Sequence, residues 1–295
     1  MRENIINFCS QYQYPQEAKE ELLSVYDAVS DTAAVKEIFS QARQEYEHDL
    51  QLDYPALLAR LKNACSQERI PWETASLLFF ICLTPQLFRH YEQSGLPAEI
   101  CRASLEDLKW KLMECRQVYG VWGTFVSDWF PGFFRLTRFT LGRLQFELIP
   151  FPDNYIRAGR EKPKGLNQAI NIHIPSSGPL LHRDCLRSYE LAMEFFRPAF
   201  PDGTYAFFCL SWLLFPDHRR FLPANSRILE FMADFDIYDA YQDPAGEDLW
   251  RIFGKPDCSD TAGLPENTSL QTAYKNWLMT GNKPGIGLGM ILKGA

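Results

Sequence analysis

The feature that most constrains the fold is a change in hydrophobic periodicity along the chain, near residue 120. Before this point apolar residues recur at every third or fourth position, a spacing typical of amphipathic helices. After it, stretches of alternating apolar and polar residues such as "GRLQFELI" and "AINIHI" lie between further helical patterns, and this alternation is typical of half-buried strands. The sequence therefore predicts an α+β fold with two domains, a helical domain over residues 1–130 and a sheet flanked by helices over residues 131–295.

The first half predicts helices packed around one buried helix. "QEAKEELLSVYDAVSD" places Ala18, Leu22 and Val25 on one stripe, and "TAAVKEIFSQARQEYEHD" repeats the pattern. "PWETASLLFFICLTPQLFRHYEQSG" is apolar on all sides in its middle, which predicts a central helix. Within it Pro85 is expected to kink or end the helix, and Gly95 is a candidate for its C-terminal cap.

The second half predicts strands and helices in alternation, which favours a mixed sheet with crossover connections over a helical bundle. "YAFFCLSWLLF" is a continuous apolar run, expected as a strand buried on both faces, and "IGLGMILK" is expected as the last strand. "LLHRDCLRSYELAMEFF", "ANSRILEFMADF" and "SLQTAYKNWLM" have helical spacing, the second with Asn225 or Ser226 as N-cap. "DLWRIFG" is predicted as a further strand.

Composition argues against several classes of function. The formal net charge is −7, so we do not expect a nucleic-acid binder, which needs a basic face. No apolar run approaches the ~20 residues of a membrane helix, and the N-terminus lacks the apolar segment of a signal peptide, so no membrane partner is expected. The 8 cysteines include no C-x-x-C pair and no zinc spacing. We therefore expect no metal site, reduced and mostly buried thiols, and a cytoplasmic protein.

The joint "HIPSSGPLL" is the strongest local signal for a binding site. Gly178 followed by Pro179 is a plausible N-cap and first helical residue after a strand. Free amides in the first turn and the helix dipole favour an anion there. His182, Arg183 and Arg187 follow within the first turns, where cations are unfavourable for an isolated helix, so an anionic partner would account for them. The alternative is an ordinary capped helix whose arginines face water.

Two residues are candidates for a general base. His173 lies with Asn171 on the polar side of its predicted strand, and a histidine there can accept a proton near pH 7. Glu147 can act directly or through a water, whereas the alternative for both is a structural polar residue on a strand face. Cys209 and Ser211 lack the surroundings of a nucleophile, so we interpret them as packing residues. The glycines of "PGIGLGM" precede no helix and fail the dinucleotide fingerprint.

Four segments in order, "RLTRFTLGRLQFEL", "INIHIPSSGPLL", "FCLSWLL" and "LPANSRILEF", resemble a bacterial family of GNAT-like acyltransferases. The resemblance covers essentially the whole chain. It implies a helical N-terminal domain followed by a GNAT-like mixed sheet flanked by helices. In such folds a central strand splays from its neighbour and binds the pantetheine arm of an acyl-CoA, and the next loop holds the pyrophosphate.

By this resemblance "INIHI" is the splayed strand, "PSSGPLL" the pyrophosphate loop and "YAFFCLSWLLF" the diverging neighbour. The implied cofactor-binding residues are Ile174, Ser176, Ser177, Gly178, Leu180 and Arg183. The usual loop motif, Arg or Gln followed after two residues by Gly-x-Gly or Gly-x-Ala, is replaced here by one glycine and a proline. That proline lacks an N–H and removes one possible phosphate donor.

The resemblance implies an N-acyltransferase that uses acetyl-CoA or another acyl-CoA as co-substrate. The acceptor would be an amine on a small molecule or a peptide, with His173 or Glu147 taking its proton. The alternative is a non-catalytic ligand- or protein-binding module on a degenerate GNAT scaffold, because a fold does not fix a function.

Overall fold

The computed structural model describes residues 1–294. The chain divides into two compact units, Met1–Phe139 and Thr140–Ala295. This division lies a few residues after the expected boundary at residue 130 and falls within strand β1 (Arg138–Leu141). The intervening segment forms the short helices η1 (Ser127–Trp129) and α7 (Pro131–Phe134). It is tied to the first unit, because the Tyr46 hydroxyl donates to the carbonyl of Phe134 at 2.6 Å.

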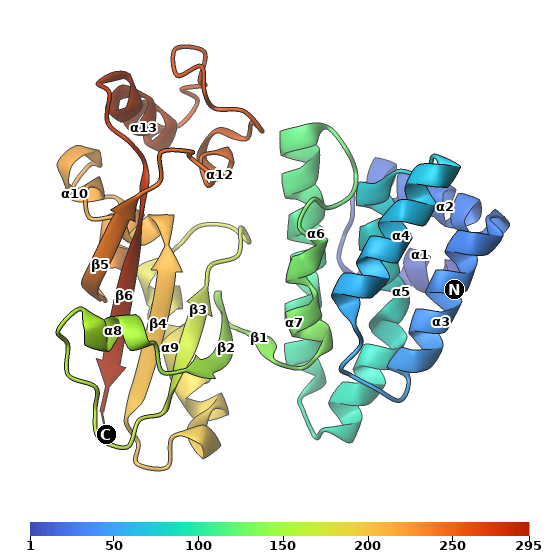
Figure 1. Cartoon of the computed structure of the whole chain (residues 1–295), viewed down its shortest axis with the longest axis horizontal. Helices are drawn as coiled ribbons and strands as arrows, with labels where there is room; N and C mark the ends of the chain where they lie inside the picture. The colour runs from blue at the N-terminus through green and yellow to red at the C-terminus, as the bar shows by residue number, and fades with distance from the viewer. Residues whose placement is uncertain (295) are drawn as a thin grey trace. The chain divides into compact units, whose positions relative to one another are not determined.

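The first unit consists mainly of long helices joined by short turns (Figure 1). The helices are α1 (Arg2–Gln11), α2 (Gln16–Asp31), α3 (Ala33–Tyr46), α4 (Tyr54–Glu68), α5 (Trp72–Gln93) and α6 (Ala98–Tyr119). The stripe predicted on α2 is confirmed, since Ala18, Leu22 and Val25 are all buried. Apolar faces of this kind form stable helices only by packing against neighbours.

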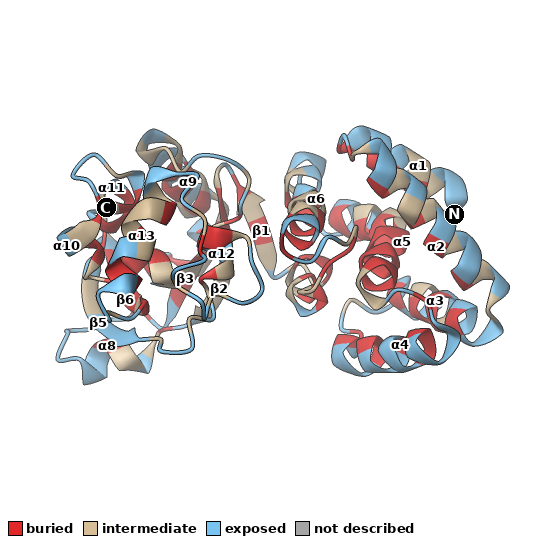
Figure 2. Cartoon of the chain, turned by 90° about the horizontal axis from the view of Figure 1, so that it is seen from above, coloured by how far each residue is buried: buried red, intermediate tan, exposed pale blue. Residues whose placement is uncertain are grey.

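Helix α5 is the centre of this unit and is buried over most of its surface, as its red colour in Figure 2 shows. Phe80 is fully buried, and its ring lies 5.8 Å from Tyr54, 5.1 Å from Phe130 and 5.0 Å from Phe134. Pro85 was expected to kink or end this helix, and the second alternative is wrong, because α5 continues to Gln93.

Pro85 is tolerated because other donors satisfy the carbonyl that its missing N–H leaves open. That carbonyl belongs to Ile81, four residues earlier in the helix. It accepts the Thr84 hydroxyl at 2.8 Å and the side-chain amide of Asn4 at 3.4 Å. Gly95 follows the end of the helix with φ +66°, as expected for a residue in the C-terminal cap.

The second unit is built on a six-stranded mixed sheet in the order β1-β2-β3-β4-β6-β5. The remaining strands are β2 (Leu144–Pro150), β3 (Gln168–His173), β4 (Tyr205–Ser211), β5 (Asp236–Gln242) and β6 (Gly285–Lys293). Strands β3 and β4 pair in parallel, whereas β2 with β3, β4 with β6 and β5 with β6 pair antiparallel. The predicted strands over "GRLQFELI", "AINIHI", "YAFFCLSWLLF" and "IGLGMILK" are therefore all present.

Helices surround this sheet, with α9 packed against one face (Figure 1). They are α8 (Asp153–Arg157), α9 (His182–Phe195), η2 (Arg197–Ala199), η3 (Trp212–Leu214), α10 (His218–Phe221), α11 (Arg227–Met232), α12 (Trp250–Phe253) and α13 (Ser269–Met279). The ring of Tyr189 on α9 lies 5.5 Å from Phe207, which lies 6.1 Å from Phe146. The opposite face of β2 and β3 carries the polar residues described below.

The sequence prediction differs from the structure at several places in this unit, one of them the end of "YAFFCLSWLLF", where η3 follows β4 instead of a longer strand. "DLWRIFG" is not a strand but contains the short helix α12. Leu249, Ile252 and Phe253 have the i, i+3, i+4 spacing of one helical face, and all three are buried in one cluster. Strand β5 was not predicted, because "DIYDAYQ" is a mostly exposed edge strand without an apolar face. Ser226 is the N-cap of α11 and accepts the amide of Ile228 at 3.3 Å.

One glycine of β6 is required by close packing. A Cβ atom on Gly287 would lie 2.1 Å from the carbonyl oxygen of Leu214. That contact is with backbone, so it cannot be relieved by a side-chain rotation. The glycines of "PGIGLGM" therefore allow β6 to pass beneath η3, consistent with their expected role in a tight final strand.

The buried His218 makes the second unit sensitive to acid. His218 is fully buried among aromatic rings, and its Nε2 atom is hydrogen-bonded to the hydroxyl of Tyr274. Desolvation by this burial lowers the pKa of His218 from its usual 6.5 to about 4. Between these values the unfolded chain binds a proton that the folded chain does not. Stability is therefore complete above pH 6.5 and is lost as the pH falls towards 4.

We expect protonation of His218 to lower the free energy of unfolding by about 3 kcal/mol as the pH falls from 7 to 4, at ~1.4 kcal/mol per pKa unit. Urea unfolding at a series of pH values measures it. His218→Phe is expected to flatten this part of the profile even though it lowers stability at pH 7 by leaving the Tyr274 hydroxyl unpaired. An unchanged slope in the variant would show that other groups cause the acid sensitivity.

Candidate functional site

The polar face of β2 and β3 brings the two candidate bases together. In the antiparallel register Glu147 lies opposite Asn171, and His173 lies opposite Gln145. Side chains of directly opposed residues share a face, so Glu147 and His173 are diagonal neighbours. His173 Nε2 lies 2.8 Å from Glu147 Oε1. Asn171 Nδ2 donates to the same carboxylate oxygen at 3.3 Å.

This contact orients the imidazole of His173. Its Nε2 atom faces both the carboxylate of Glu147 and, at 3.2 Å, Nδ2 of Asn171. The carboxylate of Glu147 then holds the ring orientation and would stabilise the imidazolium after protonation. The side chains of His173 and Glu147 are each 19% exposed, so the pair is reachable from solvent but largely enclosed. Sequence reasoning named both residues but did not assign a role to Asn171.

Strands β3 and β4 separate at the level of this pair. Their parallel pairing is limited to Ile170 with Phe207 and Asn171 with Phe208. Beyond these residues β4 continues to Ser211 and pairs there with β6, whereas β3 runs on through His173 into a loop. The paired residues of the strand predicted to splay and its predicted neighbour therefore end at Asn171 and Phe208, two positions before His173.

The loop after β3, residues 174–181, leads into α9. The predicted start of this helix at Gly178 and Pro179 is wrong, because α9 begins at His182 with Leu181 as N-cap. Gly178 has φ +106°, a conformation that a residue at the start of a helix does not take. The loop is thus longer than expected. Ser176, Ser177, Gly178 and Leu180 lie in it, and Ile174 lies directly after β3.

The start of α9 offers backbone amides, because the first N–H groups of a helix have no intrahelical acceptor and Leu181 provides no side-chain cap. Arg183 is 82% exposed and lies 3.4 Å from Asp184. His182 instead turns to the carboxylate of Asp234, with Nε2 2.8 Å from Oδ1. The same carboxylate accepts the Tyr189 hydroxyl at 3.4 Å. Arg183 therefore lies at the start of α9 beside Asp184, and His182 is in contact with Asp234.

Arg143, which sequence reasoning did not select, holds the loop from the turn between β1 and β2. Its guanidinium donates to the carbonyls of Pro175, Gly178 and Pro179 at 2.9, 2.8 and 3.1 Å. Burial lowers the pKa of Arg143 from its usual value. No sequence signal marks this contact, because the carbonyls belong to residues more than 30 positions away.

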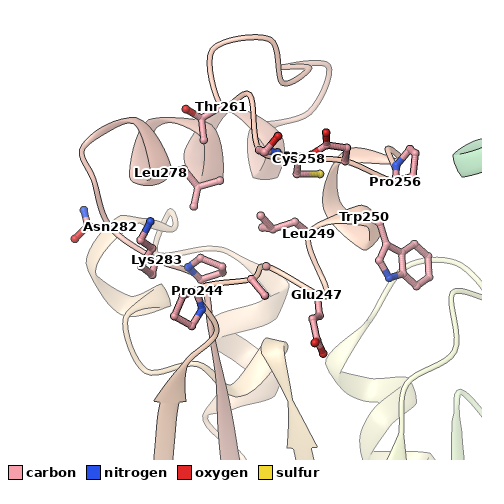
Figure 3. Close-up of a pocket in the computed structure, with 15 residues that line it drawn as sticks. Pro244, Glu247, Leu249, Trp250, Pro256, Cys258, Thr261, Leu278, Asn282 and Lys283 are labelled. Atoms are coloured by element: carbon pink, nitrogen blue, oxygen red, sulfur yellow. Dashed lines mark hydrogen bonds between the residues drawn. The ribbon is translucent and has the colours of Figure 1, made fainter.

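A separate pocket of about 320 Å³ lies in the excursion between β5 and β6 (Figure 3). In Figure 3, Leu249 and Leu278 point into it, and Pro244 and Lys283 lie near the ends of the strands. None of the residues predicted for the site lines this pocket.

Within residues 1–294 no group of three or more His, Cys, Asp or Glu side chains is arranged to hold a metal ion. Over the same range, no helix combines the length and the apolar character needed to cross a bilayer.

Known families and structures match this chain along its length. Residues 3–136 match the family described as "N-acyltransferase N-terminal domain", and residues 138–291 match the family described as "GNAT-like C-terminal domain". No curated protein matches the chain.

Among solved structures, an acyltransferase in complex with decanoyl-CoA and teicoplanin is similar with a TM-score of 0.75 and 21% identity. The match covers 97% of this chain and 86% of that one. A mutant acyltransferase in complex with octanoyl-CoA is similar with a TM-score of 0.75 and 21% identity, over 98% of this chain and 87% of that one. At this identity the structures show a shared fold. The family matches show that the chain belongs to the GNAT-like acyltransferases that carry an N-acyltransferase N-terminal domain.

Proposed function

We propose that this protein is an acyl-CoA-dependent N-acyltransferase. The observation that carries the proposal is the limited pairing of β3 with β4, followed by a loop rich in small residues. The register of β3 with β4 ends at Asn171, so the backbone after this residue is suited to hydrogen-bond the amides of a pantetheine arm. The limited pairing thus supports a role in binding acyl-CoA.

The pyrophosphate of the co-substrate would bind at the loop after β3. We assign this role to Ile174, Ser176, Ser177, Gly178, Leu180 and Arg183. The loop precedes the N-terminus of a 14-residue helix, where amides and the helix dipole favour an anion. Arg183 supplies an exposed positive charge that can reach a phosphate.

We assign the chemical step to His173 and Glu147 on the polar face of β2 and β3. The nitrogen of an amine attacks the thioester carbonyl, the amide bond forms and the carbon–sulfur bond breaks, releasing CoA. His173 takes the proton that the amine loses, and Glu147 stabilises the resulting imidazolium. Most of the remaining acceleration comes from holding the two reactants in contact. No general acid for the leaving thiolate is assigned.

The nature of the acyl group and of the acceptor rests on the structural relatives. Since these relatives were solved with decanoyl-CoA and octanoyl-CoA, we propose that the acyl chain includes medium lengths as well as acetyl. The acceptor is an amine on a small molecule or peptide, and teicoplanin, present in a related structure, is a reasonable first test compound. A cytoplasmic location is proposed because all eight cysteines are free and seven of them are buried.

Binding of acyl-CoA is expected to raise the melting temperature. A ligand that binds only the folded chain at ~100 times its dissociation constant adds about 2.7 kcal/mol of stability. CoA, acetyl-CoA, octanoyl-CoA and decanoyl-CoA should each give a dose-dependent shift, whereas adenosine without phosphates should not. Arg183→Glu should weaken the shift by placing a negative charge beside the phosphates. The absence of any shift, with no acyl transfer to amines, would favour a non-catalytic binding module on this scaffold.

A further inference from the structure

One arginine controls the conformation of the loop after β3. The three nitrogen atoms of the Arg143 guanidinium each donate to a different carbonyl of that loop: Nη1 to Pro175, Nη2 to Gly178 and Nε to Pro179. The distances lie between 2.8 and 3.1 Å, which is normal for such bonds. A planar guanidinium presents its donors in a fixed arrangement, so these bonds define the path of the loop.

The backbone of Arg143 is fixed to α9, which fixes the starting point of its side chain. Its amide donates to the Ser188 hydroxyl at 2.8 Å, and that hydroxyl donates to the carbonyl of Asp184 at 2.8 Å. The preceding residue, Gly142, has φ +73°, and a Cβ atom there would lie 2.7 Å from Ser188 Oγ. The turn between β1 and β2 thus sits directly on α9. Arg143 therefore connects the body of that helix to the loop before it.

The bonds to the carbonyls determine where the amides of the loop point. In a trans peptide the C=O of one residue and the N–H of the next point in opposite directions, and the described residues contain no cis peptide bond. Since the carbonyl of Pro179 points at the guanidinium, the N–H of Leu180 points away from it. The carbonyl of Gly178 belongs to a peptide with Pro179, which has no N–H to orient. In the peptide between Gly178 and Pro179, only the carbonyl makes a hydrogen bond, which is the one from Arg143. Pro179, which departs from the usual family motif, therefore costs this peptide no donor that the contact with Arg143 needs.

The same bonds remove an electrostatic obstacle to an anion. Carbonyl oxygens carry negative partial charge and would repel a phosphate lying on the loop. Three of them are engaged by a cation that is not deprotonated in proteins. The Leu180 amide then lies on the side opposite these carbonyls, as in other backbone sites for anions, whereas the Gly178 amide donates to the Ser176 carbonyl at 2.8 Å.

We infer that Arg143 is a positioning residue that shapes this loop for the pyrophosphate of acyl-CoA without touching the reacting atoms. This inference rests on the proposed function and adds to it a residue that fixes affinity for one part of the co-substrate. It gives Arg143 an effect on co-substrate binding and none on the chemical step.

The test compares two acyl donors, one with and one without the nucleotide part of CoA. Acyl-CoA contains the pyrophosphate with its phosphorylated adenosine, whereas acyl-pantetheine of the same chain length contains neither. Arg143→Met should raise KM for acyl-CoA at least 10-fold and leave kcat at saturation within about twofold. With acyl-pantetheine, kcat/KM should stay within about twofold of the unchanged protein. Arg143→Lys, which keeps the charge but not the planar set of donors, should recover only part of the loss.

The control variant is Arg219→Met, which makes the same substitution at an exposed arginine of the same unit. This control should leave the kinetic constants for both acyl donors unchanged. It thereby distinguishes a general effect of lost positive charge from an effect on the loop. A purely structural role of Arg143 would lower activity with both donors equally and would overturn the inference. If circular dichroism shows that Arg143→Met is poorly folded, the comparison of the two acyl donors is made with Arg143→Lys instead.

Thermal shifts with CoA and with ADP separate the inference from the proposed function. Shifts that require Arg143 in a protein that transfers no acyl group would support the inference and contradict the catalytic proposal. Acyl transfer with unchanged KM in Arg143→Met and Arg143→Lys would support the catalytic proposal and overturn the inference. A protein that binds neither CoA nor ADP would overturn both.

Discussion

Glu147→Gln is expected to slow acyl transfer by ~10²-fold or more at saturating acyl-CoA, which is the scale of a positioned acid or base. Glutamine keeps the shape of the side chain but removes the negative charge that faces His173 Nε2 at 2.8 Å. The imidazolium formed during the reaction would then lack its counter-charge. His173→Asn should lose a similar factor because it removes the proton acceptor itself. Release of CoA thiol with an amine acceptor measures both rates.

The double variant shows whether these residues act as a unit. If Glu147 works through His173, the double variant should be about as slow as His173→Asn alone. Glu190→Gln is the matched control, since it removes an exposed carboxylate on α9 that pairs with Arg187 at 2.8 Å. It should leave the rate unchanged. Rates near that of the unchanged protein in both site variants would contradict the assigned roles while leaving the family membership in place.

Phe80→Ala is expected to lower the free energy of unfolding of the first unit by about 3–5 kcal/mol, as for other buried phenylalanines. Phe80 is fully buried, with the rings of Tyr54, Phe130 and Phe134 within 6 Å. The substitution removes the apolar contact area and leaves a cavity that long, rigid helices cannot close.

Urea unfolding followed by far-ultraviolet circular dichroism measures this effect, because most long helices belong to the first unit. Phe80→Leu is the graded control and should lose less, since it fills more of the same space. A loss below about 1 kcal/mol in Phe80→Ala would mean that α5 is not the packing centre of this unit.

Most of the fold can be predicted from local hydrophobic patterns in the sequence. The helical stripe on α2 and the all-round apolar middle of α5 predicted their burial correctly, and the alternation in "AINIHI" predicted β3. The short helix α12 was mistaken for a strand because four residues are too few to distinguish a helical from an extended pattern. Strand β5 was missed because its stability comes from pairing with β6, a contact that its own residues do not reveal.

The candidate site was predicted in its residues but not in its geometry. Glu147 and His173 were both named, yet their contact depends on the register between β2 and β3, which is set by pairing across more than 20 residues. The role of Arg143 could not be predicted for the same reason. Its partners are backbone carbonyls, which carry no side-chain signal in any sequence.

The divergence of β3 from β4 has a mechanical consequence for the second unit. Only two residue pairs join the half-sheet of β1, β2 and β3 to the half-sheet of β4, β6 and β5. What spans the join is side-chain packing on the covered face, where Phe207 meets both Phe146 and Tyr189 of α9. These buried rings therefore hold the two half-sheets together where paired residues are few. Substitutions in this core are expected to act on the separation of β3 from β4 without altering any residue on the polar face.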